Sequence, residues 1–266
     1  MGSIGSPGSQ PGTVEAWALE FILTVSLAHK FAPPDAPATF EAASVDRLVD
    51  APGRPPQLRL ARRRSAVPDK LDAPSARAKL LHTFLHHELQ AAELMCWALL
   101  RFSSAEEQFR RGLMRICLDE IRHMNAYRVE IERLGFQYGD FPVRDWFWER
   151  VPTCASKIEF VALMGIGLEG ANLEHAPHFA ERLEQAGDSR AAELQRLIAR
   201  EELGHVSFAV HWFERWTRPL DFAVWCAALP APLSPLMMKG KNFDRQARLR
   251  AGMSESFITQ LERWQP

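Results

Sequence analysis

One arrangement of acidic and imidazole side chains occurs twice in this 266-residue chain. Each copy is a single glutamate followed by a Glu-x-x-His pair: Glu88, Glu120 and His123 in the first, Glu169, Glu202 and His205 in the second. Residues three apart on a helix share one face, so both side chains of a pair can bind one ion. The two spacings between the glutamates differ by a single residue, which predicts two helical hairpins of similar length.

Turn signals fall midway between the glutamates of each copy. Two residues of an antiparallel hairpin lie level only if the turn is halfway between them. In the first copy the midpoint is Ser104, which with Glu107 reads as a capping box opening the next helix. In the second copy it lies beside Gly187 and Asp188, a helix stop followed by an N-cap. We therefore expect each single glutamate to lie level with its Glu-x-x-His pair.

The candidate ligands lie in apolar helical seams. Glu120, for example, shares its seam with Ile116 and Cys117. A carboxylate in such a seam must be paired, protonated or metal-bound, because an isolated buried charge is costly. Two further glutamates, Glu93 and Glu174, face no Glu-x-x-His pair across the predicted turns. The charge of the four remaining carboxylates is roughly what two divalent cations neutralise.

On these residues the chain resembles the ferritin-like di-iron carboxylate superfamily, whose four-helix bundle holds metal with two single glutamates and two Glu-x-x-His pairs. The resemblance implies an all-α, ferritin-like four-helix bundle with a long second-to-third helix crossover and extra N- and C-terminal helices. It implies six metal ligands, namely Glu88, Glu120, His123, Glu169, Glu202 and His205. Two Fe ions are expected, with Fe/Mn or Mn as alternatives for the same ligands, and O₂ as co-substrate.

More narrowly, the chain is similar, over roughly residues 75–216, to a bacterial ferritin-like family of unassigned function. The stretches that carry this similarity are His87-Glu88-Leu89-Gln90, Tyr138-Gly139-Asp140-Phe141-Pro142 and Ala171-Asn172-Leu173-Glu174. That family implies no substrate.

The first Glu-x-x-His motif also resembles the Asp-Glu-x-Arg-His form found in bacterial multicomponent monooxygenases. In those enzymes the aspartate beside the ligand glutamate orients an imidazole of the opposite helix, and metal-bound histidines usually donate their second N–H in this way. We therefore expect Asp119 to orient a ligand histidine. In the second copy Glu201 stands in place of the aspartate and Gly204 in place of the arginine, so Glu201 has this role less clearly. Asn172 completes the predicted catalytic residues as a hydrogen-bond donor.

Apolar periodicity predicts bundle helices at residues 75–102, 104–134, 156–186 and 189–216. The expected divisions are an N-terminal helix and Pro/Ala-rich arm, the di-metal bundle, and a C-terminal extension: residues 1–74, 75–216 and 217–266. Single helices are expected over residues 13–30 and 244–264. The link 135–155 can cross a whole bundle, because extended chain spans up to ~3.5 Å per residue. Its many aromatic residues either cover the core or contact a substrate.

Composition limits the partners. The formal net charge of −1 gives no general attraction for nucleic acid or an anionic membrane, and residues 17–27 are too short and too acidic to span a membrane. The N-terminal Met-Gly-Ser matches a myristoylation signal but also a flexible leader. Four cysteines without a Cys-x-x-Cys motif indicate a reducing cytoplasm. We interpret Cys117 as a small buried apolar residue, with a redox role as the alternative.

These observations predict a non-haem di-iron oxygenase or oxidase that uses O₂ to oxidise or hydroxylate a small organic substrate. An external electron donor and a monomer or small homo-oligomer are compatible with this hypothesis. The alternatives are a ferroxidase or iron-handling protein and a tRNA-hydroxylase-like enzyme. Only the short basic run of Arg59, Arg62, Arg63 and Arg64 favours the last of these. Gly165 and Gly204 are expected to leave room for the substrate.

Overall fold

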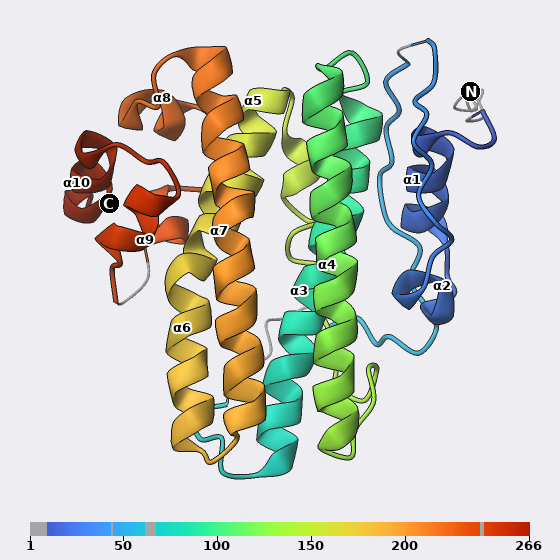
Figure 1. Ribbon diagram of the computed structural model, residues 1–266, viewed down its shortest axis with the longest axis vertical. Coiled ribbons are helices and arrows are strands. Elements are labelled where there is room, and N and C mark those ends of the chain that lie inside the picture. Colours follow the sequence, from blue (N-terminus) through green and yellow to red (C-terminus); the bar gives the residue numbers. More distant parts are fainter. Residues whose placement is uncertain (1–9, 44, 62–67, 240–241) are drawn as a thin grey trace. The chain divides into compact units, whose positions relative to one another are not determined.

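Every regular element of the described chain is helical. The computed structural model describes residues 10–43, 45–61, 68–239 and 242–266 (Figure 1). In these ranges the one extended pairing is an isolated bridge between Leu60 and Val143. The all-α prediction is therefore confirmed. The chain divides into two compact units, Met1–Pro152 and Thr153–Pro266. The ferritin-like arrangement of four helices stays a prediction.

The first unit is built on a helical hairpin. Helices α3 (Pro74–Arg101) and α4 (Glu107–Arg133) pack along each other, as Figure 1 shows in teal and green. Both agree closely with the predicted ranges. The predicted capping box was wrong, because α4 begins after Glu106, whose side chain makes no capping hydrogen bond. Instead, Asp46 Oδ1 accepts hydrogen bonds from the backbone N–H and the hydroxyl of Ser103, at 3.0 and 2.7 Å.

The N-terminal arm forms two helices where one was predicted. They are α1 (Val14–Leu23) and α2 (Leu27–Phe31). Ser26 separates them because its hydroxyl caps α2, accepting a hydrogen bond from the backbone N–H of His29 at 3.3 Å. Helix α1 packs against α3 and buries an apolar face that includes the stacked rings of Trp17 and Phe21.

The link after α4 covers the hairpin with aromatic side chains. It includes the short helix η1 (Val151–Thr153). Tyr138 and Trp148 are both buried. The Tyr138 hydroxyl lies 2.6 Å from His86 Nδ1, and Trp148 Nε1 donates to Glu93 Oε2 at 2.8 Å. For these two aromatic residues, the structure supports the interpretation as a cover over the core.

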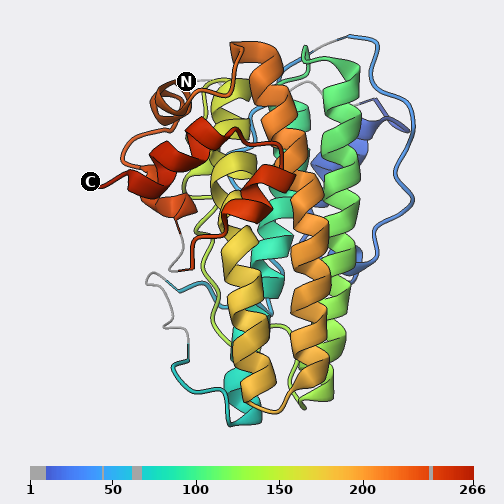
Figure 2. The ribbon, with the colours of Figure 1, turned by 60° about the vertical axis from the view of Figure 1, so that its left-hand side comes forward.

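The second unit contains the other hairpin. The predicted helix at 156–186 consists of α5 (Lys157–Phe160), the π-helix η2 (Val161–Glu169) and α6 (Gly170–Gln185). Helix α7 (Ser189–Thr217) returns alongside α6, as Figure 2 shows. Asp188 caps α7 as predicted, accepting from the backbone N–H of Ala191 at 3.2 Å. The π-helix has no apolar signature of its own, so periodicity predicted continuous α-helix; π-helical turns are rare and occur frequently at functional sites.

The C-terminal extension adds short helices to this unit. They are α8 (Phe222–Ala227), η3 (Pro235–Met238), α9 (Arg245–Arg250) and α10 (Glu255–Arg263). The single helix predicted over 244–264 was wrong. Gly252 adopts a φ of 92°, which ends α9, and Ser254 then caps α10.

Two glycines were expected to leave room for a substrate, and the structure gives them other roles. A Cβ atom on Gly165 would lie 2.3 Å from the Cβ of Ala209. Gly165 therefore allows η2 to approach α7 closely, and Ala209 fills the space. Gly204 is exposed, and a Cβ atom added there would meet nothing within 4 Å, so this position faces away from the buried ligands. The expectation was wrong for both positions.

This contrast predicts opposite effects of one substitution. Gly165→Ala should lower the free energy of unfolding by about 1–3 kcal/mol, because the added methyl group overpacks the contact with Ala209. The matched control Gly204→Ala should raise it by up to about 1 kcal/mol, because alanine favours an exposed helix. Urea unfolding followed by circular dichroism measures both changes. Equal midpoints for the two variants would rule out the close approach.

Candidate metal centre

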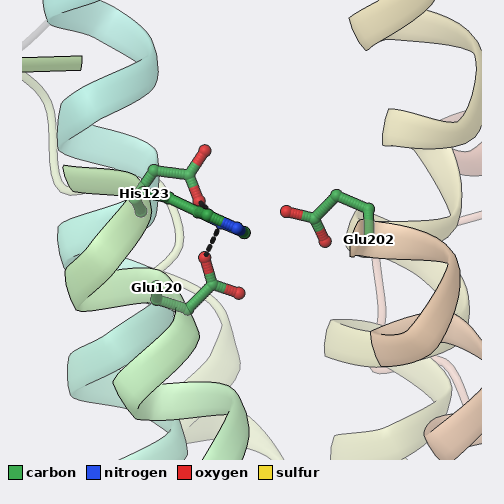
Figure 3. A group of neighbouring side chains, drawn as sticks. Glu120, His123 and Glu202 are labelled. Atoms are coloured by element: carbon green, nitrogen blue, oxygen red, sulfur yellow. Dashed lines mark hydrogen bonds and ion pairs between the residues drawn. The ribbon is translucent and has the colours of Figure 1, made fainter. Parts of the chain in front are cut away.

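Three predicted ligands meet within the first unit. His123 Nδ1 on α4 lies 3.3 Å from Glu120 Oε2 and 3.6 Å from Glu88 Oε2 on α3. Each side chain offers one ligand atom, and these atoms lie within 4.8 Å of one another. All three are buried, with Glu120 0% exposed. Figure 3 shows the Glu120–His123 contact. The predicted level placement of Glu88 and its Glu-x-x-His pair is confirmed, and we call these three residues the first half-site.

The electrostatics of the first half-site suit a cation. Burial, followed by the nearby charge of Glu120, raises the pKa of Glu88 well above its usual range. Burial disfavours a charged His123, but hydrogen bonds to Glu120 and Glu88, together with their charges, raise its pKa to about 12. Glu88 and His123 therefore both hold their protons more tightly than the free side chains do. A divalent cation can replace those protons, so these residues fit a metal ion.

The second half-site belongs to the second unit and consists of Glu169, Glu202 and His205. Glu169 ends η2, while the pair lies on α7, which packs against η2. His205 Nδ1 lies 3.0 Å from Glu202 Oε2, and all three residues are buried. Asn172 Nδ2 donates to Glu169 Oε2 at 3.4 Å. Asn172 therefore donates to a candidate ligand, and its expected catalytic role stays a prediction.

Asp119 and Glu201, the two acidic residues expected to orient histidines, are less buried than the candidate ligands. Asp119 Oδ1 lies 2.7 Å from Arg122 Nη2 on the same helix, with 42% of the aspartate side chain exposed. Glu201 is half-buried on α7. The expected role of each is to hold a histidine of the opposite hairpin. This orienting role would join residues of different units, and it stays a prediction.

Two other buried glutamates bind cations of the chain itself. Glu93 follows Glu88 at the same spacing at which Glu174 follows Glu169. Glu93 Oε1 lies 2.8 Å from Lys30 Nζ and 2.6 Å from an Arg54 nitrogen. Burial opposes ionisation of Glu93, but Arg54 and Lys30 nevertheless lower its pKa. In the second unit Glu174 Oε1 lies 2.6 Å from Arg248 Nη1. Both glutamates therefore have cationic partners within their own units.

The cations that bind Glu93 belong to a larger buried ionic cluster in the first unit. Its members are linked by hydrogen bonds: Lys30, Arg54, His86, Glu93, Tyr138, Asp145 and Trp148. The sequence did not predict this cluster. Arg54 and Asp145 lie in segments without a periodic pattern, Lys30 is the last residue of the helix predicted over 13–30, and no local signal indicates which partner each one meets. The position of Glu93 was a partial signal. Glu93 lies on a predicted bundle helix but faces no Glu-x-x-His pair, so it needed a partner other than a metal.

This cluster predicts a specific acid dependence. Burial opposes ionisation of Asp145, but hydrogen bonds with His86 and Arg54 lower its pKa to about 2. Because the folded-state pKa is depressed, the stabilisation is complete above the unfolded value of about 3.9 and is lost as pH falls toward 2. Asp145→Asn should lower the free energy of unfolding by up to about 2 kcal/mol at pH 7. Urea unfolding across the acid range should show the two proteins converging below about pH 4. A constant difference would contradict this.

Some sequence-based hypotheses concern residues outside the described ranges. Of the basic run, Arg62, Arg63 and Arg64 lie outside them, as does the myristoylation match at residues 1–9. Arg59 is described, and its Nη2 donates to the backbone oxygen of Asp140 at 2.6 Å. Among the helices that the structure describes, none has the length and apolar character needed to cross a membrane.

The fold and the first half-site define an all-helical protein with a buried carboxylate–histidine group able to bind a metal ion. Residues 16–259 match the family described as "Protein of unknown function (DUF455)", and the chain belongs to this family. An uncharacterized protein of Haemophilus influenzae (strain ATCC 51907 / DSM 11121 / KW20 / Rd) is 30% identical over 188 residues, covering 67% of this chain. The match covers 65% of that relative, which is less than two thirds of its length. No solved structure matches the chain.

Proposed function

We propose that this protein is a non-haem di-iron oxygenase or oxidase acting on a small organic substrate. The observation that carries the proposal is the first half-site, Glu88 with Glu120 and His123, together with its buried repeat in the second unit. In the proposal the six side chains hold two iron ions, with manganese as an alternative for one or both. The ligand types support this choice of metal, because carboxylates and imidazoles suit iron or manganese better than thiolate-preferring metals.

The chain's own residues have distinct parts in this function. The four glutamates and two histidines of the half-sites would bind the ions, and the bound iron would supply the electrons that reduce O₂. Asn172 holds the Glu169 carboxylate in place through its hydrogen bond. Burial of both half-sites keeps bulk water away from the ligands. A location in the reducing cytoplasm is part of the proposal, because the sequence has four cysteines and no Cys-x-x-Cys motif.

The anchored extensions favour an enzyme over an iron store. Arg54 of the arm and Arg248 of the C-terminal extension reach buried glutamates on the hairpin helices, so both additions are integral to their units. A four-helix bundle suffices for ferroxidase ligands. The additional segments are more readily explained if the protein shapes a substrate pocket.

Oxygen consumption tests the proposal. The reduced, iron-loaded protein should consume O₂ in near-stoichiometric proportion to its iron, and sustained consumption should require an organic substrate and a reductant. An oxygen electrode and size-exclusion chromatography measure the stoichiometry and the expected monomer or small oligomer. Glu120→Ala is the control and should consume no O₂ beyond that of free iron. A large hollow shell that mineralises excess Fe(II) would instead establish the ferroxidase alternative.

A further inference from the structure

Two cysteines of the first unit lie in contact. Cys96 on α3 and Cys117 on α4 have their sulfur atoms 3.4 Å apart, and both side chains are fully buried. Both are free thiols. The contact lies within one hairpin, between helices that pack along their length. The sequence indicated Cys117 alone, because nothing local to either cysteine shows that the two helices bring them together.

Each cysteine of the pair lies one helical turn from a buried charged residue described above. Cys117 precedes Glu120 of the first half-site by one helical turn, and Cys96 follows Glu93 of the buried ionic cluster by one turn. A disulfide requires a sulfur–sulfur distance of about 2.05 Å, so the two atoms must approach by about 1.4 Å. Side-chain rotation on two adjacent helices can supply a movement of that size.

Access to the pair is selective. Burial, followed by the hydrogen bond with Cys96, raises the pKa of Cys117 well above its usual range. The thiol form therefore dominates at neutral pH, and bulky or charged reagents in solution do not reach it. A small uncharged oxidant is the kind of molecule that can enter such a site.

We propose that Cys96 and Cys117 are a redox-active dithiol that hydrogen peroxide converts to a disulfide. One cysteine loses its thiol proton and attacks the peroxide as the thiolate; the O–O bond breaks, the departing hydroxide takes up a proton, and a sulfenic acid and one water form. The second thiol then attacks the sulfenic sulfur and displaces the second water. Two thiols thus lose two electrons and two protons, and one peroxide becomes two waters. The disulfide would cross-link the hairpin that carries the first half-site.

This inference goes beyond the proposed function and is tested without a bound metal. The full-length protein is treated with one equivalent of hydrogen peroxide in the presence of a chelator, then denatured and alkylated. Trypsin releases Cys96 in Leu80–Arg101 and Cys117 in Ile116–Arg122, so mass spectrometry can identify the cross-linked pair directly. We expect this cross-link and the loss of two of the four thiols per chain.

Two variants make the result specific. The double variant Cys154→Ser/Cys226→Ser retains the pair alone and should lose both remaining thiols. Cys96→Ser should form no intramolecular disulfide and should instead give a sulfenic acid at Cys117, detected by dimedone labelling. The inference is overturned if wild-type Cys96 and Cys117 are still alkylated after excess peroxide. It is equally overturned if they become sulfinic or sulfonic acids without a cross-linked peptide. Neither result would bear on iron binding.

Discussion

Protein produced with added iron should contain about two iron or manganese ions per chain, and Glu120→Ala or His123→Ala should remove at least one. Glu120 and His123 lie one turn apart beside Glu88, and removal of either leaves the first half-site with too few ligands. Elemental analysis by inductively coupled plasma mass spectrometry, normalised to protein concentration, gives the stoichiometry. The effect should be near all-or-none, because a site with open ligand positions loses most of its affinity.

A matched control separates ligand loss from general damage. Glu130 is also a buried glutamate of α4, but it pairs with Arg133 on the same helix. Glu130→Ala should therefore retain the full metal content. Circular dichroism should show that all three variants remain helical. Folded wild-type protein without either metal would refute the proposed centre, and equal losses in Glu130→Ala would show that the ligand variants act through stability alone.

The second large effect concerns Arg54. Arg54→Ala should lower the free energy of unfolding by about 3–5 kcal/mol, because it leaves the buried Glu93 and the partly buried Asp145 with less compensating charge. The Arg54 side chain is 10% exposed and Glu93 is 0% exposed, so water cannot replace the lost interaction. Urea unfolding monitored by tryptophan fluorescence measures the change. Breaking one member of such a cluster is costly even where replacing the whole cluster with apolar residues would not be.

The control for this prediction is an exposed ion pair of similar geometry. Arg144 Nη2 lies 2.6 Å from Glu149 Oε2, with 27% and 42% of the side chains exposed. Arg144→Ala should change the unfolding midpoint little, because solvent and salt screen exposed pairs. If Arg54→Ala and Arg144→Ala shift the midpoint equally, the buried ionic cluster does not contribute as inferred.

The hairpin helices and the first half-site could be predicted from sequence because both follow from spacing. A helix places residues by a fixed period, so an apolar stripe gives its range and a Glu-x-x-His pair gives a shared face. The level placement of Glu88 and Glu120 was predicted correctly although Ser104 does not cap α4. Register depends on the length of the hairpin, and Asp46 can hold the turn as well as a local cap does.

The buried ion pairs, the π-helix and the breaks in the terminal helices could not be predicted. The ion pairs depend on contacts between segments distant in the sequence. Glu93 meets Lys30 and Arg54, and Glu174 meets Arg248, because folding brings segments from outside the four predicted bundle helices onto those helices. The π-helix has the same apolar character as an α-helix, so its different hydrogen bonding leaves no trace in the pattern. The broken terminal helices follow from the caps at Ser26 and Ser254, which compete with helix propagation.

The paired spacing of buried glutamates has a practical consequence for choosing where to cut this chain. A fragment limited to residues 75–216 would include Glu93 and Glu174 but would lack Lys30, Arg54 and Arg248, the cations that bind them in the structure. Each hairpin would then have a buried glutamate without these ion-pair partners. A fragment designed to fold must therefore reach from the arm helices to α9, because the outer segments carry the charges that the hairpin interiors need.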